Sequence, residues 1–189
     1  GANGTLDDSV NNLVEIDLGD VVLAQYETPV VATLSIFTKA KSNGAITILN
    51  PAPAGDVSKE LLDVTDYLVV NEIELGMISG VEVSPEPTQE EIELAIKSIR
   101  AAGCNSNIIL TLGARGVQAF LEDGQIVEIA GIKVDVQDTT GAGDCFVGNF
   151  ASKLSQGESV ESSLNYANTA ASISVQRDGA GPSMPTRKV

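Results

Sequence analysis

Apolar residues fall along the chain in two alternating patterns, short continuous runs and longer stretches with helical spacing. The run VVLAQY at 21–26 has the length of one buried strand, and similar runs recur further along. Buried strands are predicted at residues 21–26, 45–49, 67–71 and 107–113. Helices are predicted at residues 30–44, 60–64, 88–102, 142–155 and 160–175. Strands and helices therefore alternate, with short connections between them.

Local signals mark several of these boundaries. Thr88 followed by Glu91 is a capping box that starts a helix. The apolar face expected for that helix consists of Ile92, Leu94, Ala95, Ile96 and Ile99. Residues 116–131 are predicted to form a β-hairpin with Asp123 and Gly124 at its turn, because Asp-Gly favours tight turns.

The alternation of strand and helix indicates the α/β class. The expected architecture is a three-layer αβα sandwich with a mostly parallel central sheet, because repeated strand-helix-strand units bury a parallel sheet under helices. Ligands of such sheets bind at the carboxyl ends of the strands. With 189 residues and no interior linker, the whole chain 1–189 is predicted to belong to a single domain.

The charge of the chain narrows the possible partners. There are 26 acidic against 11 basic residues, giving a formal charge of −15, so the overall field opposes nucleic acids and anionic membranes. An anionic ligand then needs a local positive site. Histidine is absent from the sequence, so acid-base chemistry must use Asp, Glu, Lys or Tyr.

The number of cysteines and the length of the apolar runs indicate where in the cell the protein is located. Two cysteines are too few for a disulfide framework, which favours a reducing, cytoplasmic location, and Cys104 follows a helical pattern as a buried thiol does. The longest apolar runs are far shorter than a membrane span. No membrane association is therefore expected.

The segment DTTGAGDCFVGN at 138–149 is the first candidate site. Gly141, Ala142 and Gly143 lie where an apolar helix begins, so unpaired amides and the helix dipole there can bind an anion. Asp144 in the same turn could accept a proton from an alcohol that attacks a phosphoryl group. The alternative is structural, with glycines in a tight turn and an Asp that complements the helix terminus.

The segment NEIE at 71–74 is the second candidate. Asn71 ends a predicted strand and Glu74 follows one helical turn later, so both side chains could face one ligand, the amide a phosphate and the carboxylate a hydrated metal ion. The alternative is an ordinary capping box with Asn71 as N-cap.

Two glycine-containing turns complete the set. TLGARG at 111–116 could bring backbone close to a flat ring or a phosphate, and RDGAGPS at 177–183 follows the last predicted helix. Either could equally be a structural turn.

In this order the four segments resemble the C-terminal half of the ribokinase family of carbohydrate kinases, and the resemblance covers essentially the whole chain. DTTGAGD is similar to the family's signature, while NPAPA at 50–54 and GAGPSMPTR at 179–187 resemble its ribose-specific members. The resemblance implies transfer of the γ-phosphate of ATP to the 5-hydroxyl of D-ribose. Fructokinase or another sugar or nucleoside kinase, or a non-catalytic nucleotide-binding module, remains open as an alternative.

The resemblance also implies roles for individual residues. Asp144 matches the catalytic base, and the backbone of Gly141, Ala142 and Gly143 matches the anion hole. The residues that match those serving ATP and its Mg²⁺ are Asn71, Glu74, Thr111, Leu112, Gly113, Ala114, Arg115, Gly116 and Asn168. The ligands expected for an activating K⁺ ion are Asp138, Thr140, Ser174, Arg177, Gly179 and Ser183.

The chain departs from the family in its extent. The segments that match the sugar pocket, the lid and the first strands of the sheet are absent from these residues, so the chain is expected to be the C-terminal part of a longer kinase, itself expected to be a homodimer. By themselves the 189 residues are expected to hold the ATP site and to be inactive. An uncovered sheet edge with exposed apolar faces is a further expectation.

Overall fold

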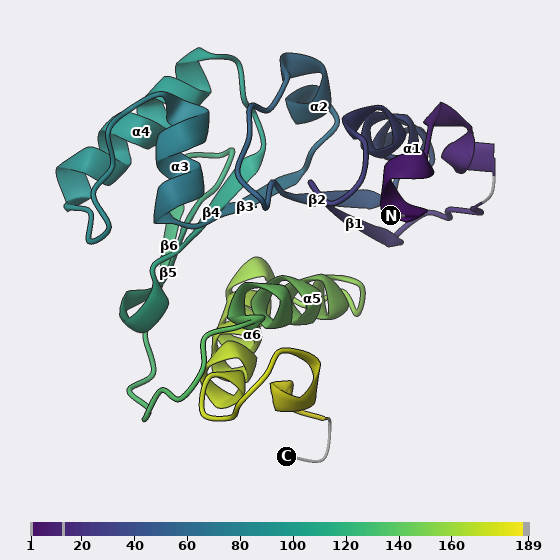
Figure 1. Cartoon of the computed structure of the whole chain (residues 1–189). Helices are drawn as coiled ribbons and strands as arrows, with labels where there is room; N and C mark the ends of the chain where they lie inside the picture. The colour runs from purple at the N-terminus through teal and green to yellow at the C-terminus, as the bar shows by residue number, and fades with distance from the viewer. Residues whose placement is uncertain (1, 13, 187–189) are drawn as a thin grey trace. The chain divides into compact units, whose positions relative to one another are not determined.

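The fold was analysed in a computed structural model, which describes residues 2–12 and 14–186 (Figure 1). Its strands are β1 (Val21–Gln25), β2 (Ile46–Asn50), β3 (Tyr67–Val70), β4 (Asn107–Thr111), β5 (Gly116–Phe120) and β6 (Ile126–Ala130). Its α-helices are α1 (Val30–Ser42), α2 (Lys59–Asp63), α3 (Glu72–Ser79), α4 (Gln89–Ala101), α5 (Ala142–Leu154) and α6 (Val160–Ser174). Short 3₁₀ helices are η1 (Ala2–Thr5), η2 (Asp8–Asn12), η3 (Gly113–Arg115) and η4 (Gly181–Ser183).

The strands form one sheet in the order β1-β2-β3-β4-β5-β6, and the first four pair in parallel. Strands of a parallel sheet are mostly buried on both faces and therefore consist of continuous apolar runs. The apolar runs in the sequence predicted these four strands correctly for this reason. The α/β class with a mostly parallel sheet is therefore confirmed. The turn at Asp123 and Gly124 also forms as predicted, with the Leu121 amide donating to the Gln125 carbonyl at 2.9 Å.

The chain separates into two compact units. The first contains the residues up to Thr111 together with Ala119–Ile126, and the second contains Leu112–Gln118 and the residues from Val127 onward. In the first unit, helices α1 to α4 lie along one face of the parallel strands (Figure 1). The largest fully buried side chains there include Phe37, Ile48, Leu68, Ile108 and Ile109.

The second unit is built on α5 and α6, which are neighbours in sequence and pack against each other (Figure 1). The rings of Phe146 and Phe150 stack within α5 with centroids 6.4 Å apart. Leu164 and Ala167 of α6 are completely buried. An apolar face on each helix thus supplies the core of this unit.

The helix α4 shows where periodicity succeeded and where it did not. Thr88 and Glu91 form the predicted capping box, and Ile92, Ala95, Ile96 and Ile99 are buried. Leu94 was placed on the same face and is 56% exposed, so that assignment is wrong. Two residues advance a helix by about 200°, which turns Leu94 away from Ile92.

Strand β1 lies at one end of the sheet order, with β2 as its neighbour. Leu23 of β1 is 39% exposed, and Val31 of α1 is 52% exposed. Both apolar side chains are therefore exposed, in agreement with the expectation of uncovered apolar surface. Within the described residues, no helix is both long enough and apolar enough to cross a membrane.

Candidate functional site

Asn71 and Glu74 lie where the carboxyl end of β3 meets the start of α3. The Asn71 side chain accepts a hydrogen bond from the Glu74 amide at 2.9 Å, and the Glu74 carboxylate accepts one from the Asn71 amide at 2.9 Å. This is a complete capping box. The structure therefore confirms that these residues cap a helix, and their additional role toward a ligand stays a prediction.

The capping residue Glu74 is only 6% exposed, which is unusual for an acidic side chain. Burial raises the pKa of its carboxyl above the usual 4.5, although the hydrogen bond from the Asn71 backbone acts in the opposite direction. Glu91 caps α4 in the same way, but hydrogen bonds from Thr88 lower its pKa. The two capping boxes therefore shift the pKa values of their carboxylates in opposite directions.

We expect this difference to appear as opposite pH dependence of two matched variants. A raised pKa in the folded state means that stability from Glu74 is fully present at low pH and is lost as pH rises above 4.5 through the folded value. Glu74→Gln should therefore gain thermal stability relative to the wild type as pH rises from about 4 to 8. Glu91→Gln should instead lose stability relative to the wild type as pH rises through the lowered folded pKa towards 4.5, and the loss should stay constant above 4.5. A lowered pKa stabilises the fold above 4.5, and that stability is lost as pH falls through the folded value.

Thermal unfolding of both variants and the wild type at several pH values measures these differences. If the stabilities of the two variants relative to the wild type change in the same direction with pH, the opposite pKa shifts of Glu74 and Glu91 are contradicted.

The TLGARG segment forms a tight closed loop. Thr111 ends β4, and its hydroxyl donates to the Val70 carbonyl at 3.3 Å. In the second unit the Leu112 amide donates to the Gly116 carbonyl at 2.8 Å, which closes the loop over η3. The residues between are Gly113, Ala114 and Arg115.

Both glycines of this loop have positive φ, +53° at Gly113 and +96° at Gly116. A Cβ on Gly116 would lie 2.0 Å from the Ile129 carbonyl oxygen, whereas a Cβ on Gly113 would meet nothing within 4 Å. Gly116 is therefore required by the close approach of the neighbouring strand. Gly113 has open space beside it, so a ligand could approach the backbone closely at this position.

The DTTGAGD segment forms the N-terminus of α5 as predicted, with Gly141 as N-cap at φ +75°. Asp144 is exposed in the first turn. The amide of Ala142 donates to the Thr139 carbonyl at 3.1 Å, so the expectation that this amide is unpaired is wrong. A turn at 139–142 precedes the helix and supplies that acceptor. In the described part of the chain no hydrogen bond uses the amides of Gly141 or Gly143.

Asp138 connects this segment with the loop after α6. Its Oδ1 accepts hydrogen bonds from the Thr140 amide at 2.9 Å and the Thr140 hydroxyl at 2.6 Å. Its Oδ2 accepts one from the Gly179 amide at 2.8 Å. The Thr140 hydroxyl is the main cause of a lowered pKa at Asp138, with the amides of Thr140 and Gly179 contributing. The carboxylate is thereby kept ionised.

Backbone hydrogen bonds join the 137–140 segment to the end of α6, and the role of these residues toward a monovalent cation stays a prediction. The amides of Gln137 and Asp138 donate to the Val175 carbonyl at 2.8 and 3.2 Å, which anchors the 137–140 segment at the end of α6. Ser183 is buried, and its hydroxyl donates to the Ala180 carbonyl at 2.7 Å. The remaining residues proposed as ligands lie on the same stretch: Ser174, Arg177 and Gly179.

Asn168 of α6 lies nearly buried, 9% exposed, and its side-chain amide donates to the Ala130 carbonyl at 3.0 Å. This bond fixes α6 to the end of β6 and leaves the side-chain oxygen as an acceptor. The resemblance places Asn168 near adenine, and that role stays a prediction.

Sequence reasoning did not single out two polar residues at the carboxyl ends of β1 and β2. The Gln25 side chain donates to the Asn50 side chain at 2.9 Å, and Asn50 donates to the Val69 carbonyl at 2.9 Å. Asn50 begins the NPAPAG turn directly after a predicted strand, so its position was a usable signal. Gln25 gave none, because it lies inside a predicted strand.

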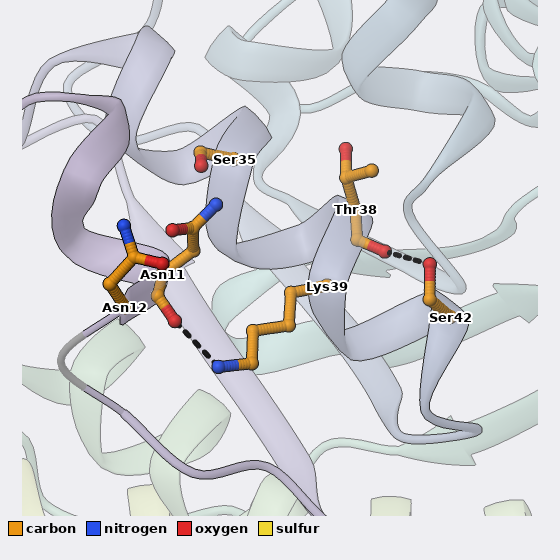
Figure 2. A pocket seen from close by; sticks show the side chains of 6 residues that line it. All are labelled: Asn11, Asn12, Ser35, Thr38, Lys39 and Ser42. Carbon is orange, nitrogen blue, oxygen red and sulfur yellow. Dashed lines mark hydrogen bonds between the residues drawn. The ribbon is translucent and has the colours of Figure 1, made fainter.

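A surface hollow in the first unit involves none of the predicted site residues. It has a volume of about 380 Å³ and is lined by Asn11, Asn12, Ser35, Thr38, Lys39 and Ser42. Figure 2 shows the Lys39 amine donating to the Asn11 backbone and the Ser42 hydroxyl donating to the Thr38 carbonyl, at 2.6 and 2.8 Å. These bonds tie the N-terminal segment to α1, and they account for the polar lining.

Known proteins place these observations in a family. The model of the pfkB family carbohydrate kinases matches residues 9–187. The ribokinase of Staphylococcus aureus strain COL is 37% identical over 188 residues, covering 98% of this chain and 60% of that protein. The ribokinase of Schizosaccharomyces pombe is 31% identical over 188 residues, with 98% and 59% covered.

Solved structures agree with the sequence comparison. Arabidopsis thaliana ribokinase complexed with ribose and ATP superposes with a TM-score of 0.84 at 34% identity, covering 98% of this chain and 58% of that one. Ribokinase from Thermotoga maritima gives a TM-score of 0.81 at 33% identity. This chain spans about 60% of the length of the curated relatives it matches. The chain belongs to the pfkB family of carbohydrate kinases.

Proposed function

We propose that this chain forms the nucleotide-binding part of an ATP-dependent kinase that phosphorylates the 5-hydroxyl of ribose. The observation that carries the proposal is the N-terminal turn of α5, where Asp144 follows the backbone of Gly141 and Gly143. Family membership and the identity to ribokinases support ribose over other sugars. An acidic chain needs such a local amide site to receive a phosphate.

In the proposed reaction Asp144 accepts the proton of the sugar hydroxyl. The hydroxyl oxygen forms a bond to the γ-phosphorus, the bond between that phosphorus and the β,γ-bridging oxygen breaks, and ADP leaves with the electron pair. The amides at the start of α5 stabilise the charge on the transferring group, and the helix dipole adds to them. Asp144 then releases its proton to solvent.

Mg²⁺ fits as an ion that arrives with the nucleotide. Among residues 2–12 and 14–186 there is no group of three or more His, Cys, Asp or Glu side chains that could hold a metal. Mg²⁺ in nucleotide sites is bound mostly by phosphate oxygens and water, with one or two carboxylates from the protein. Glu74 would face that hydrated ion, and Asn71 the phosphates. When bound, the ion would neutralise charge on the triphosphate.

For the ATP itself, the proposed contacts are the loop residues and one residue of α6. The open space beside Gly113 supports a backbone approach to the nucleotide. The residues assigned to this role are Thr111, Leu112, Gly113, Ala114, Arg115, Gly116 and Asn168.

K⁺ is proposed as an activating ion between the 138–140 segment and the loop after α6. The support is the ionised carboxylate of Asp138 and the hydrogen bonds that join the two segments. Oxygen donors of this kind suit a hard cation. The proposed ligands are Asp138, Thr140, Ser174, Arg177, Gly179 and Ser183. A homodimeric assembly of the whole protein and a cytoplasmic location are proposed only from the resemblance.

The protein that carries these residues should form ADP when given ribose and Mg-ATP, and it should do so faster in K⁺. Direct measurement of ADP release at fixed ionic strength, with K⁺ replaced by tetramethylammonium, tests both statements. Fructose in place of ribose is the control for the sugar.

Absence of ADP formation with any sugar would contradict the kinase assignment and favour a non-catalytic nucleotide-binding module. Equal rates in the two cations would contradict the K⁺ site alone. A preference for fructose would overturn the assignment of ribose.

A further inference from the structure

We propose that Ala180 is a positioning residue for the anion site at the N-terminus of α5, and this inference rests on the proposed function. Ala180 belongs to the loop after α6, and it lies 39 positions after the N-cap Gly141 in a sequence of 189 residues. Nothing in its chemistry marks it for a reaction. Its importance comes from what its methyl group touches.

Ala180 lies directly against the N-cap of α5. A Cβ built on Gly141 would be 3.0 Å from the Ala180 Cβ and 3.1 Å from the Ala180 Cα, closer than side-chain carbons ordinarily approach. By contrast, a Cβ built on Gly143 would meet nothing within 4 Å. One side of the first turn is therefore backed by the loop, while the other side is open to a ligand.

The loop that carries Ala180 is itself held at both ends. On one side the Gly179 amide donates to the Asp138 carboxylate at 2.8 Å. On the other, the Ala180 carbonyl accepts the Ser183 hydroxyl at 2.7 Å and the Ser183 amide at 3.3 Å. Ser183 is 1% exposed, so this anchor lies inside the unit.

These contacts make a continuous support from Asp138 through Gly179 and Ala180 to Gly141. The position of the Gly141 and Gly143 amides decides how well they meet a transferring phosphoryl group, and such placement is sensitive because a misplacement of about 1 Å can cost about 100-fold in rate. A methyl group that backs the N-cap limits the freedom of that turn. Without it, the turn gains room to shift away from the phosphate.

The first test is Ala180→Gly in the protein that carries these residues. We expect kcat for ribose phosphorylation to fall about tenfold while the Kd for Mg-ADP, which lacks the transferred phosphate, stays unchanged. Gly181→Ala is the matched control, because it adds a methyl in the same loop where a Cβ would meet nothing within 4 Å. Its kcat should equal that of the wild type.

A double-mutant cycle tests the contact itself. Gly141→Ala introduces the crowded Cβ, and Ala180→Gly removes the Cβ that it meets 3.0 Å away. The double variant should therefore lose less activity than the product of the two single losses. Multiplicative losses would show that the two residues do not act through each other and would overturn the proposal.

Amide resonances of the ¹⁵N-labelled chain give a readout that does not need activity. Ala180→Gly should shift the Gly141 and Gly143 resonances and leave in place that of Gly157, which follows the opposite end of α5 in the same unit. Unchanged resonances at Gly141 and Gly143 together with unchanged kcat would refute the positioning role. If the wild type forms no ADP, the proposed function fails, and the resonances still decide whether Ala180 fixes the start of α5.

Discussion

Replacing Asp144 with Asn is expected to lower kcat by about 10² to 10⁴, the usual cost of removing a general base. The amide preserves the shape of the carboxylate but cannot accept the proton of the sugar hydroxyl. Affinity for Mg-ATP should stay close to that of the wild type, because the backbone of Gly141 and Gly143 is untouched. Steady-state kinetics and calorimetric titration with Mg-ATP measure the two quantities.

Asp178→Asn is the matched control for Asp144→Asn. It removes one negative charge from an exposed residue of the same unit, so it reproduces the change in net charge without touching the proposed base. Its kcat should lie within about twofold of the wild type, as expected for an exposed and screened charge. An Asp144→Asn variant with full turnover would show that the proton goes elsewhere.

Replacing Gly116 with Ala is expected to lower the free energy of unfolding by about 3 kcal/mol or more. Two costs add at this position, the positive φ of +96° and the overlap of the new Cβ with the Ile129 carbonyl oxygen at 2.0 Å. Each costs about 1 to 3 kcal/mol on its own. The variant should also weaken nucleotide binding, because Gly116 closes the 111–116 loop.

Gly124→Ala separates the two costs of Gly116→Ala. Gly124 has a positive φ of +87° in the turn between β5 and β6, and a Cβ there would meet nothing within 4 Å. Its loss in stability should therefore be about 1 to 2 kcal/mol, from backbone strain alone. Urea unfolding of the chain and both variants measures the difference. Equal losses would mean that the strand relaxes away from Ile129 at little cost.

Helix α3 shows a limit of periodicity. Residues 72–79 were not predicted as a helix of their own, although Asn71 and Glu74 were considered as a cap. In the structure Ile73 and Met77 are 64% and 57% exposed, while Glu74 is buried. Leu75 is the one apolar residue of this helix that is fully buried, and it lies next to the buried acid, so the hydrophobic pattern gives only a weak signal for the helix.

The sequence by itself determined the features that act over a few residues. Apolar runs identified the buried strands, and the caps at Asn71 and Thr88 formed because each cap and its partner are 3 residues apart. The α/β class followed from the alternation of strand and helix. The start of α5 was likewise recognisable from glycines before an apolar run.

Only the tertiary structure decided how the segments of the second unit meet. The bond between Asp138 and Gly179 joins residues 41 positions apart, and the bond between Asn168 and Ala130 spans 38 positions. The need for glycine at 116 and at 141 comes from Ile129 and Ala180, which local patterns do not connect with them. Periodicity and capping signals extend only a few residues along the chain, so contacts of this range exist only once the chain has folded.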